Sequence, residues 1–178
     1  LNAVLSLTQL MLARGTGRDP EEERGFLEVV DRNGRHLLAL INSILDLSKI
    51  EAGTVELEYS TVFPKEAMEE ALGTIRPLIA EKGLALEVKM GDCTAMAADA
   101  EKLHRVLINL LSNAVKFTDT GTVTVSAESD EREVRFTVAD TGIGIPADEQ
   151  PHVFDEFRQV DGSATRRFGG TGLGLAIC

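Results

Sequence analysis

The sequence predicts an α+β protein in which a helical hairpin over residues 1–53 precedes a layered domain over residues 54–178. Three observations support this prediction. Mainly apolar residues recur every three or four positions from Leu27 to Ser48, which indicates a long helix with one apolar seam. Gly53 then marks the end of that helix. Beyond it, segments with the period of a strand and segments with the period of a helix follow one another, which is typical of a sheet covered by helices.

The composition excludes several classes of function. The chain has 178 residues, of which 43% are hydrophobic, so it can bury a core of ordinary size. Its formal net charge of −11 argues against nucleic acid and anionic membranes as partners. Cys93 and Cys178 are far apart, so we expect no disulfide framework and a reducing, cytoplasmic setting. No apolar run approaches the roughly 18 residues that span a bilayer, which leaves open an anchor elsewhere in a longer protein.

The first 53 residues contain two helix signals. Residues 1–13 (LNAVLSLTQLMLA) have helical spacing, and the glycines of residues 15–18 end that pattern. A second helix is expected to begin at Pro20 and to end near Glu51, because proline suits the first helical position and three glutamates follow it. A lone hairpin cannot bury both helices, so a homodimeric four-helix bundle is expected. Packing of the hairpin on its own second domain is the alternative.

The second domain contains alternating helix and strand signals. Asp99 is a suitable N-cap for the helix expected over residues 103–118. Pro77 is expected to bend or break the helix in which it lies. The expected elements are a strand at 54–60, a helix at 64–82, a strand at 84–90, a short strand within 91–98, a helix at 103–118, and a hairpin of strands at about 122–128 and 132–139.

The helix over residues 103–118 has a polar face opposite its apolar face. Asn109, Asn113 and Lys116 are spaced by four and three residues, so they share one stripe. Amide oxygens and an ammonium group can hold a hydrated Mg²⁺ ion and anionic oxygens, because Mg²⁺ needs few protein ligands beside phosphate. An ordinary solvated helix face is the alternative interpretation.

A carboxylate and two glycines follow the last predicted strand. Asp140 opens a tight turn, and Gly142 and Gly144 allow a ligand to approach bare backbone. A carboxylate beside such a turn suits the exocyclic amine of a purine. A simple strand-ending turn, closed by the aspartate side chain, is the alternative.

Four glycines precede the apolar C-terminal residues. Glycines that open a helix can direct backbone N–H groups at phosphate. No Lys-Ser or Lys-Thr pair follows them, so this is not a Walker-type P-loop. Phe154, Phe157, Arg158, Arg166 and Arg167 lie in the segment before the glycines, which we interpret as a lid with aromatic anchors and cationic fingers, or else as a plain surface loop. The glycines are Gly169, Gly170, Gly172 and Gly174.

Together and in this order, these motifs resemble the N box, G1 box, F box and G2 box of the sensor histidine kinases, whose catalytic domain has the Bergerat ATP-binding fold. The resemblance covers nearly the whole chain. It implies that Asn113 is the Mg²⁺ ligand, with Asn109 and Lys116 near the phosphates of ATP, and that Asp140 accepts a hydrogen bond from the adenine amine. The remaining implied contacts are Gly142 and Gly144 at the base and ribose, Gly170, Thr171, Gly172, Leu173 and Gly174 around the triphosphate, and Arg166 near the γ-phosphate.

The helical hairpin resembles the same family. Residues 35–53 (RHLLALINSILDLSKIEAG) are similar to the second helix of its dimerisation and phosphotransfer domain. In the family, the phosphoacceptor histidine precedes sequence of the type that starts at Leu1, so residues 1–178 are not expected to contain it. His36 has no adjacent acidic residue and is not a replacement. The family also continues beyond Cys178 with further strands. The fragment alone is therefore not expected to autophosphorylate.

The resemblance implies a function and leaves two alternatives. An intact protein of this family binds Mg²⁺-ATP, transfers the γ-phosphoryl group to a histidine of its dimerisation helix, and passes it to an aspartate of a response-regulator receiver domain. Asn109 occupies the position at which ATP-hydrolysing relatives of this fold carry a glutamate, and an amide is not a general base. The alternatives are an ATP-hydrolysing machine of the topoisomerase or chaperone type and a non-catalytic dimerisation module.

Overall fold

The computed structural model describes residues 20–159 and 172–178. The chain divides into two compact units, Leu1–Gly53 and Thr54–Cys178. The helix expected over residues 1–13 lies outside the described residues.

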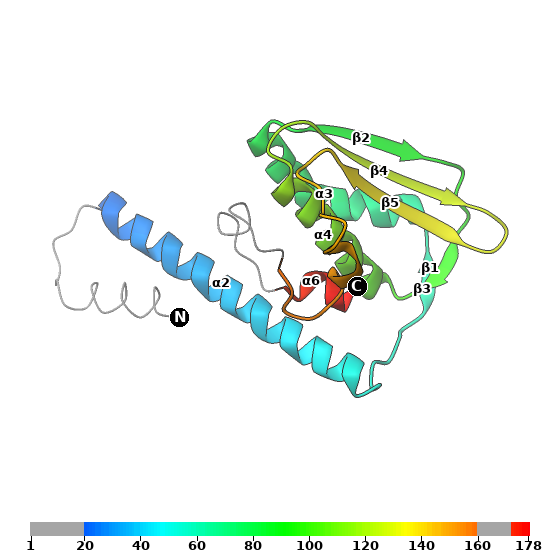
Figure 1. Cartoon of the computed structure of the whole chain (residues 1–178), viewed down its shortest axis with the longest axis horizontal. Coiled ribbons are helices and arrows are strands. Elements are labelled where there is room, and N and C mark those ends of the chain that lie inside the picture. Colours follow the sequence, from blue (N-terminus) through cyan, green and yellow to red (C-terminus); the bar gives the residue numbers. More distant parts are fainter. Residues whose placement is uncertain (1–19, 160–171) are drawn as a thin grey trace. The chain divides into compact units, whose positions relative to one another are not determined.

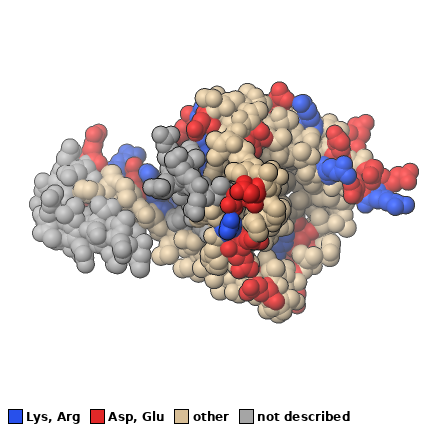
Figure 2. Space-filling view, viewed as in Figure 1, with Lys and Arg blue, Asp and Glu red and all other residues tan. Residues whose placement is uncertain are grey.

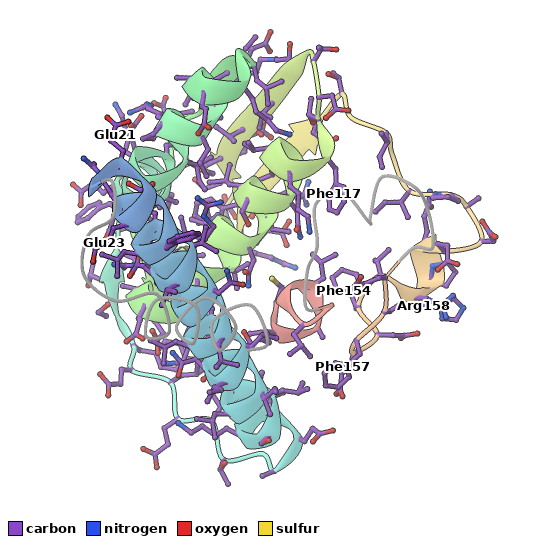
Figure 3. All side chains as sticks on the ribbon, turned by 90° about the vertical axis from the view of Figure 1, so that its left-hand side faces the viewer. Glu21, Glu23, Phe117, Phe154, Phe157 and Arg158 are labelled. Atoms are coloured by element: carbon purple, nitrogen blue, oxygen red, sulfur yellow. The ribbon has the colours of Figure 1, made fainter. Side chains whose placement is uncertain are left out.

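The first unit contains the long helix α2, Pro20–Glu51, which begins and ends where the sequence predicts (Figure 1). Figure 3 shows Glu21 and Glu23 at its N-terminal end, where carboxylates interact favourably with the helix dipole. Much of the predicted apolar seam is exposed in the single chain, as is the neighbouring stripe that widens it. The exposed apolar side chains include Leu27, Leu37, Leu38, Ile41, Ile44 and Leu45. The structure describes the helix itself, and the predicted four-helix dimer stays a prediction.

The second unit is a mixed sheet with helices on one face (Figure 1). The sheet has the order β2-β4-β5, with β2 parallel to β4 and β4 antiparallel to β5. Parallel neighbours need a crossover connection, and helix α4 lies within the one that joins β2 to β4. The α+β architecture with one helical layer is thus confirmed. Its main elements are α3 (Pro64–Lys82), β2 (Ala85–Met90), α4 (Ala100–Phe117), β4 (Thr122–Ser129) and β5 (Val134–Asp140).

The remaining elements are short. A separate two-stranded sheet pairs β1 (Ser60–Val62) with β3 (Met96–Ala98). A 3₁₀ turn η1 (Gln150–His152) and the helix α6 (Gly174–Ile177) follow β5 in the chain.

The core lies between the sheet and the two helices α3 and α4. Along β4, Val123, Val125 and Ala127 are fully buried while the residues between them are partly buried, as expected for a sheet covered on one face. The helices contribute side chains that are also fully or nearly fully enclosed. These are Met68, Leu72 and Ile75 from α3 and Leu107 and Leu111 from α4.

The strand predicted at 54–60 is wrong over most of its length. Strand β1 begins at Ser60, which pairs with Ala98, and β3 offers only three residues for pairing. Residues 54–59 therefore have no strand beside them, although their alternating sequence is suited to one. Val55, Leu57 and Tyr59 are left exposed.

Two smaller expectations also change. Helix α3 passes through Pro77 without a break, since Ile75 and Ile79 on its buried face anchor the helix on both sides of the exposed proline. Strand β5 begins at Val134 rather than at residue 132. The carboxylate of Asp130 accepts the backbone N–H groups of Arg132 and Glu133 at 2.7 and 3.0 Å, which holds both residues in the turn.

Asp99 caps helix α4, as predicted, and also fixes the segment that precedes β1. One carboxylate oxygen accepts the backbone N–H of Lys102 at 3.0 Å, and the other accepts that of Glu58 at 3.1 Å. These backbone hydrogen bonds, from Lys102 first and Glu58 next, lower the pKa of Asp99 below its ordinary value of 3.8.

Replacing Asp99 by asparagine should lower the melting temperature at neutral pH, because an amide cannot accept hydrogen bonds on both sides. A carboxyl group with a lowered pKa stabilises the fold above its ordinary pKa and loses that contribution as the pH falls through the folded value. The difference between wild type and Asp99→Asn should therefore narrow below about pH 4. Thermal unfolding monitored by circular dichroism from pH 3 to pH 7 measures this.

The exposed Asp92 provides the matched control, and Asp92→Asn should leave the melting temperature unchanged. A difference between wild type and Asp99→Asn that stays constant over the whole pH range would show that the carboxylate is not the stabilising group.

Candidate functional site

The candidate site is built around the C-terminal half of helix α4. Its apolar side packs into the core through Leu107, Leu111 and Ala114, while Asn109 and Asn113 are only partly buried. The amphipathic division predicted for this helix is therefore present. Figure 3 shows Phe117 at its C-terminal end, in the second unit.

The C-terminal end of α4 has hydrogen-bond donors from outside the helix. The last carbonyl oxygens of a helix have no partners within it and need others. The ammonium of Lys82, at the end of α3, donates to the carbonyl oxygens of Val115 at 2.8 Å, Lys116 at 3.0 Å and Thr118 at 3.1 Å. The buried hydroxyl of Thr118 donates to the carbonyl oxygen of Ala114 at 2.7 Å.

The remaining carbonyl oxygen at this end, that of Phe117, accepts the backbone N–H of Ile143 at 3.2 Å. This bond ties the turn after β5 to the helix. A Cβ atom on Gly142 would lie only 2.3 Å from the same carbonyl oxygen, so no other residue fits there without a shift of the backbone. Gly144 is needed for a different reason, since its φ is +68° and the space around it is open.

Asp140 stands at the start of this turn and is exposed. Its Oδ1 accepts the N–H of Gly142 at 2.9 Å, which is the side-chain-closed turn that the sequence left as an alternative. A structural role in closing the turn is compatible with a role in binding a purine amine, because this hydrogen bond uses only one of the two carboxylate oxygens. No described residue donates a hydrogen bond to Oδ2, so a ligand could use that atom.

The glycine-rich segment is described from Gly172 onward, and Arg166, Gly170 and Thr171 lie outside the described residues. Gly172 has a φ of +69°, and a Cβ atom there would lie 2.7 Å from the backbone carbon of Phe157. The carbonyl oxygen of Gly174 accepts the side-chain amide of Asn109 at 3.2 Å. Leu173 is fully buried, so only its backbone is available to a ligand.

Asn113 and Lys116 complete the polar stripe of α4. No described residue hydrogen-bonds the side chain of Asn113. The ammonium of Lys116 lies 4.8 Å from the ring centroid of Phe117, and partial burial lowers its pKa. Within residues 20–159 and 172–178 there is no cluster of three or more His, Cys, Asp or Glu that could hold a metal ion. A metal here would need Asn113 together with ligands from a substrate or water, which fits the coordination habits of Mg²⁺.

Three of the residues that we interpreted as a lid, Phe154, Phe157 and Arg158, lie in the segment after Gly144 (Figure 3), whereas Arg166 and Arg167 are outside the described residues. Phe154 and Phe157 are 64% and 61% exposed, so neither is packed into a core. The guanidinium of Arg158 forms a forked ion pair with Glu149, at 3.0 and 2.9 Å from its two carboxylate oxygens. Arg158 is thus engaged within its own segment in this structure, and its role as a cationic finger stays a prediction.

Sequence reasoning missed two residues at the site, Lys82 and Thr118. A lysine in the last turn of a helix is ordinarily read as a partner of that helix's own end. Its actual acceptors come from another helix more than 30 residues further along the chain. Acidic side chains are spread over the visible surface (Figure 2), so a carboxylate would be the more usual partner to expect for this half-buried lysine.

Comparison with known proteins identifies both parts of the chain. Residues 1–53 match the family model described as the His Kinase A (phospho-acceptor) domain. Residues 98–178 match the family model described as a histidine kinase-, DNA gyrase B- and HSP90-like ATPase. The two matches define a phospho-acceptor segment followed by an ATPase-like domain. The chain belongs to the sensor histidine kinases and carries their transmitter core.

Individual relatives agree with this assignment. The chain is 39% identical over 181 residues to the circadian input-output histidine kinase CikA of Synechococcus elongatus, covering 99% of the chain and 24% of that protein. It is 37% identical to the signal transduction histidine-protein kinase BarA of Escherichia coli, covering 99% and 20%. The crystal structure of full-length ShkA in complex with AMPPNP superposes with a TM-score of 0.78 at 31% identity, covering 99% and 36%. The chain therefore spans only a part of the relatives it matches.

Gly142→Ala should distort the turn after β5, because the added methyl group meets the carbonyl oxygen of Phe117. We expect a lower melting temperature and changed amide resonances at Ile143 in a ¹⁵N–¹H correlation spectrum. Gly73→Ala is the matched control. Gly73 lies in the exposed interior of α3 with open space where a Cβ atom would lie, so alanine should stabilise the fold by up to about 1 kcal/mol. Equal effects of the two substitutions would contradict the steric account of Gly142.

Proposed function

We propose that this chain forms the Mg²⁺-ATP site and the dimerisation helices of a sensor histidine kinase. In the intact protein the γ-phosphoryl group of ATP passes to a histidine of the dimerisation domain and then to an aspartate of a response regulator. The observation that carries the proposal is the exposed Asp140 carboxylate, held in a glycine turn that is bonded to the end of α4. The family matches and the AMPPNP complex of ShkA give independent support.

Asp140 suits the recognition of adenine. Its Oδ1 is occupied by the N–H of Gly142, which leaves Oδ2 as an acceptor of fixed direction. The exocyclic amine of adenine is a donor, whereas the matching group of hypoxanthine or guanine is an acceptor. A carboxylate therefore favours adenine over both.

The polar stripe of α4 suits the phosphates. We assign the oxygen of Asn113 to Mg²⁺, whose chemistry is to neutralise charge on the β- and γ-phosphate oxygens when bound. Lys116 supplies a cationic group near them, and the N–H groups around Gly172 and Gly174 supply donors. Asn109 acts by holding the carbonyl oxygen of Gly174, which fixes the glycine segment against the helix.

The phosphoryl transfer needs a nucleophile from the dimerisation domain. A histidine nitrogen forms a bond to the γ-phosphorus while the bond between that phosphorus and the β,γ-bridging oxygen breaks, and ADP leaves. The residues described above contribute by positioning and by charge neutralisation. Asn109 has no basic atom that could activate water, and its amide nitrogen already donates to Gly174. This favours transfer to a protein group over hydrolysis.

The exposed seam of α2 supports a homodimer. Leu37, Ile41 and Ile44 are each between 37% and 46% exposed in the single chain, although they recur at the spacing of a helix–helix interface. A second copy of the hairpin would cover them in a four-helix bundle. The match of residues 1–53 to the phospho-acceptor family gives the same expectation, with a response-regulator receiver domain as the further partner.

An ATP-hydrolysing machine is the second candidate, since the matched ATPase family also includes gyrase- and HSP90-like proteins. The match of the first 53 residues and the identity of Asn109 speak against it. Phosphate release from Mg²⁺-ATP by this chain, compared with Asn109→Glu, separates the candidates, because sustained release by the wild type would favour hydrolysis.

Asp140→Asn should weaken ATP binding about tenfold to a hundredfold, because an amide N–H turned toward the adenine amine replaces an acceptor by a donor, and a bond to a charged group is worth roughly 1.5–3 kcal/mol. Binding of ITP should weaken less, since its 6-oxo group accepts a hydrogen bond. Isothermal titration calorimetry with both nucleotides and Mg²⁺ measures the difference.

Asp148→Asn, an exposed change in the following segment, is the control and should bind ATP as the wild type does. Equal ATP affinity of Asp140→Asn and wild type would refute the adenine assignment. No binding by the wild type would favour the third interpretation, a non-catalytic dimerisation module.

A further inference from the structure

We propose that Lys82 is a positioning residue of the nucleotide site, although it belongs to α3 and to none of the motifs that define the site. Its ammonium gathers three carbonyl oxygens at the C-terminal end of α4, and this fixes the turn that carries Asp140. The proposal deepens the proposed function, because its ligand is the nucleotide of that function. The positioning itself can be tested without any nucleotide.

Lys82 has the geometry of a clamp. Its Nζ lies 2.8, 3.0 and 3.1 Å from the carbonyl oxygens of Val115, Lys116 and Thr118. An ammonium group has three N–H bonds, so these acceptors can use all of them. The side chain of Lys82 is 28% exposed, and the carboxylate of Asp119 lies 4.0 Å away at the edge. The charge is therefore only partly screened by water.

The position of the clamp is electrostatically favourable. The C-terminal end of a helix carries partial negative charge on its open carbonyl groups, and a cation there is stabilising. Here the cation comes from the neighbouring helix α3, whose own C-terminal end is capped by Gly83 in the left-handed conformation. The N–H of Gly83 donates to the carbonyl oxygen of Ala80, and the N–H of Leu84 donates to that of Ile79. Gly83 and Leu84 thus cap the end of α3, and the Lys82 ammonium donates to the carbonyl oxygens of α4.

The carbonyl oxygen of Phe117 connects the clamp to the site. It lies between the carbonyl groups of Lys116 and Thr118, which both bind Lys82, and it accepts the N–H of Ile143. The peptide units on both sides of this acceptor are thus held by one ammonium group. The hydroxyl of Thr118 lies 3.5 Å from Oδ1 of Asp140, so the same turn of chain also contacts the carboxylate.

Loss of the clamp should therefore act at a distance. Without Lys82, three carbonyl groups lose their donor, including the two on either side of the Phe117 carbonyl, and the peptide plane of Phe117 can rotate. The carbonyl oxygen of Phe117 then no longer points at the N–H of Ile143, and the hydrogen bond between them is lost. Gly142, the residue before Ile143, also becomes free to move, and its N–H is the group that orients the Asp140 carboxylate. Small displacements of a binding group are costly, because recognition of adenine requires alignment of donor and acceptor.

The test compares Lys82→Met with Lys82→Arg and with Lys89→Met in the full chain. Methionine approximates the unbranched aliphatic part of the lysine side chain and removes the charge and the donors. Lys82→Met should accelerate hydrogen exchange of the Ile143 amide about tenfold, measured by NMR at a temperature at which the variant is folded. It should also weaken Mg²⁺-ATP binding about tenfold in calorimetry. Lys82→Arg should keep most of the protection of the Ile143 amide and most of the affinity for Mg²⁺-ATP, because arginine retains the charge and several donors.

Lys89 is exposed on β2 and paired with Glu87, so Lys89→Met should change neither quantity. Unchanged exchange at Ile143 in folded Lys82→Met would overturn the proposal. If Lys82→Met does not fold, the ¹⁵Nζ resonance of Lys82 in the wild type decides: slow proton exchange supports the clamp, and exchange at the rate of a free lysine overturns it. Absence of ATP binding by the wild type would count against the proposed function, while the Ile143 amide would still decide the positioning.

Discussion

The site depends on the hydrogen-bond donors that pair with the carbonyl oxygens at the C-terminal end of α4. A helix leaves its last carbonyl oxygens without internal partners, and burying them without donors is costly. At the end of α4, the partners come from three places, namely the ammonium of Lys82, the hydroxyl of Thr118 and the N–H of Ile143. Because each donor belongs to a different part of the chain, satisfying this one end brings α3, α4 and the turn after β5 into a fixed arrangement.

The other end of the same helix is anchored in a comparable way. Asp99 caps α4 and also holds the backbone of Glu58, so its carboxylate connects the segment before β1 to the helix. Between the two ends, Asn109 holds the carbonyl oxygen of Gly174. Helix α4 is thus tied by hydrogen bonds to the segment before β1, to the turn that follows Asp140 and to the glycine segment.

Features that depend on local chemistry could be predicted from the sequence. The bounds of α2 and α3, the cap at Asp99, the two faces of α4 and the turn at Asp140 all follow from spacing and from residue type. The strand at 54–60 failed for a non-local reason, since its sequence is suited to a strand but β3 is too short to pair with it. Pairing partners cannot be read from the alternating pattern alone.

The same distinction explains what was missed at the site. Lys82 and Thr118 have ordinary local sequences, and their importance arises only when α3 and the end of α4 meet. The ion pair of Arg158 with Glu149, nine residues earlier, could not be foreseen for the same reason, because it depends on how the segment after Gly144 folds back on itself. Motifs with a distinctive residue type and spacing, such as the glycines, can be recognised in the sequence. The residues that hold these motifs in place can be recognised only in the folded structure.

The most direct test of this account is an NMR titration of the ¹⁵N-labelled chain with Mg²⁺-ATP. If the turn after β5 and the glycine segment form one nucleotide site around α4, the amide resonances of Gly142, Ile143, Gly172 and Gly174 should shift together with a single dissociation constant, while those in the middle of β2 should not. Shifts confined to one of the two segments, or different dissociation constants for them, would contradict the account, because they would show that these segments do not bind the same molecule.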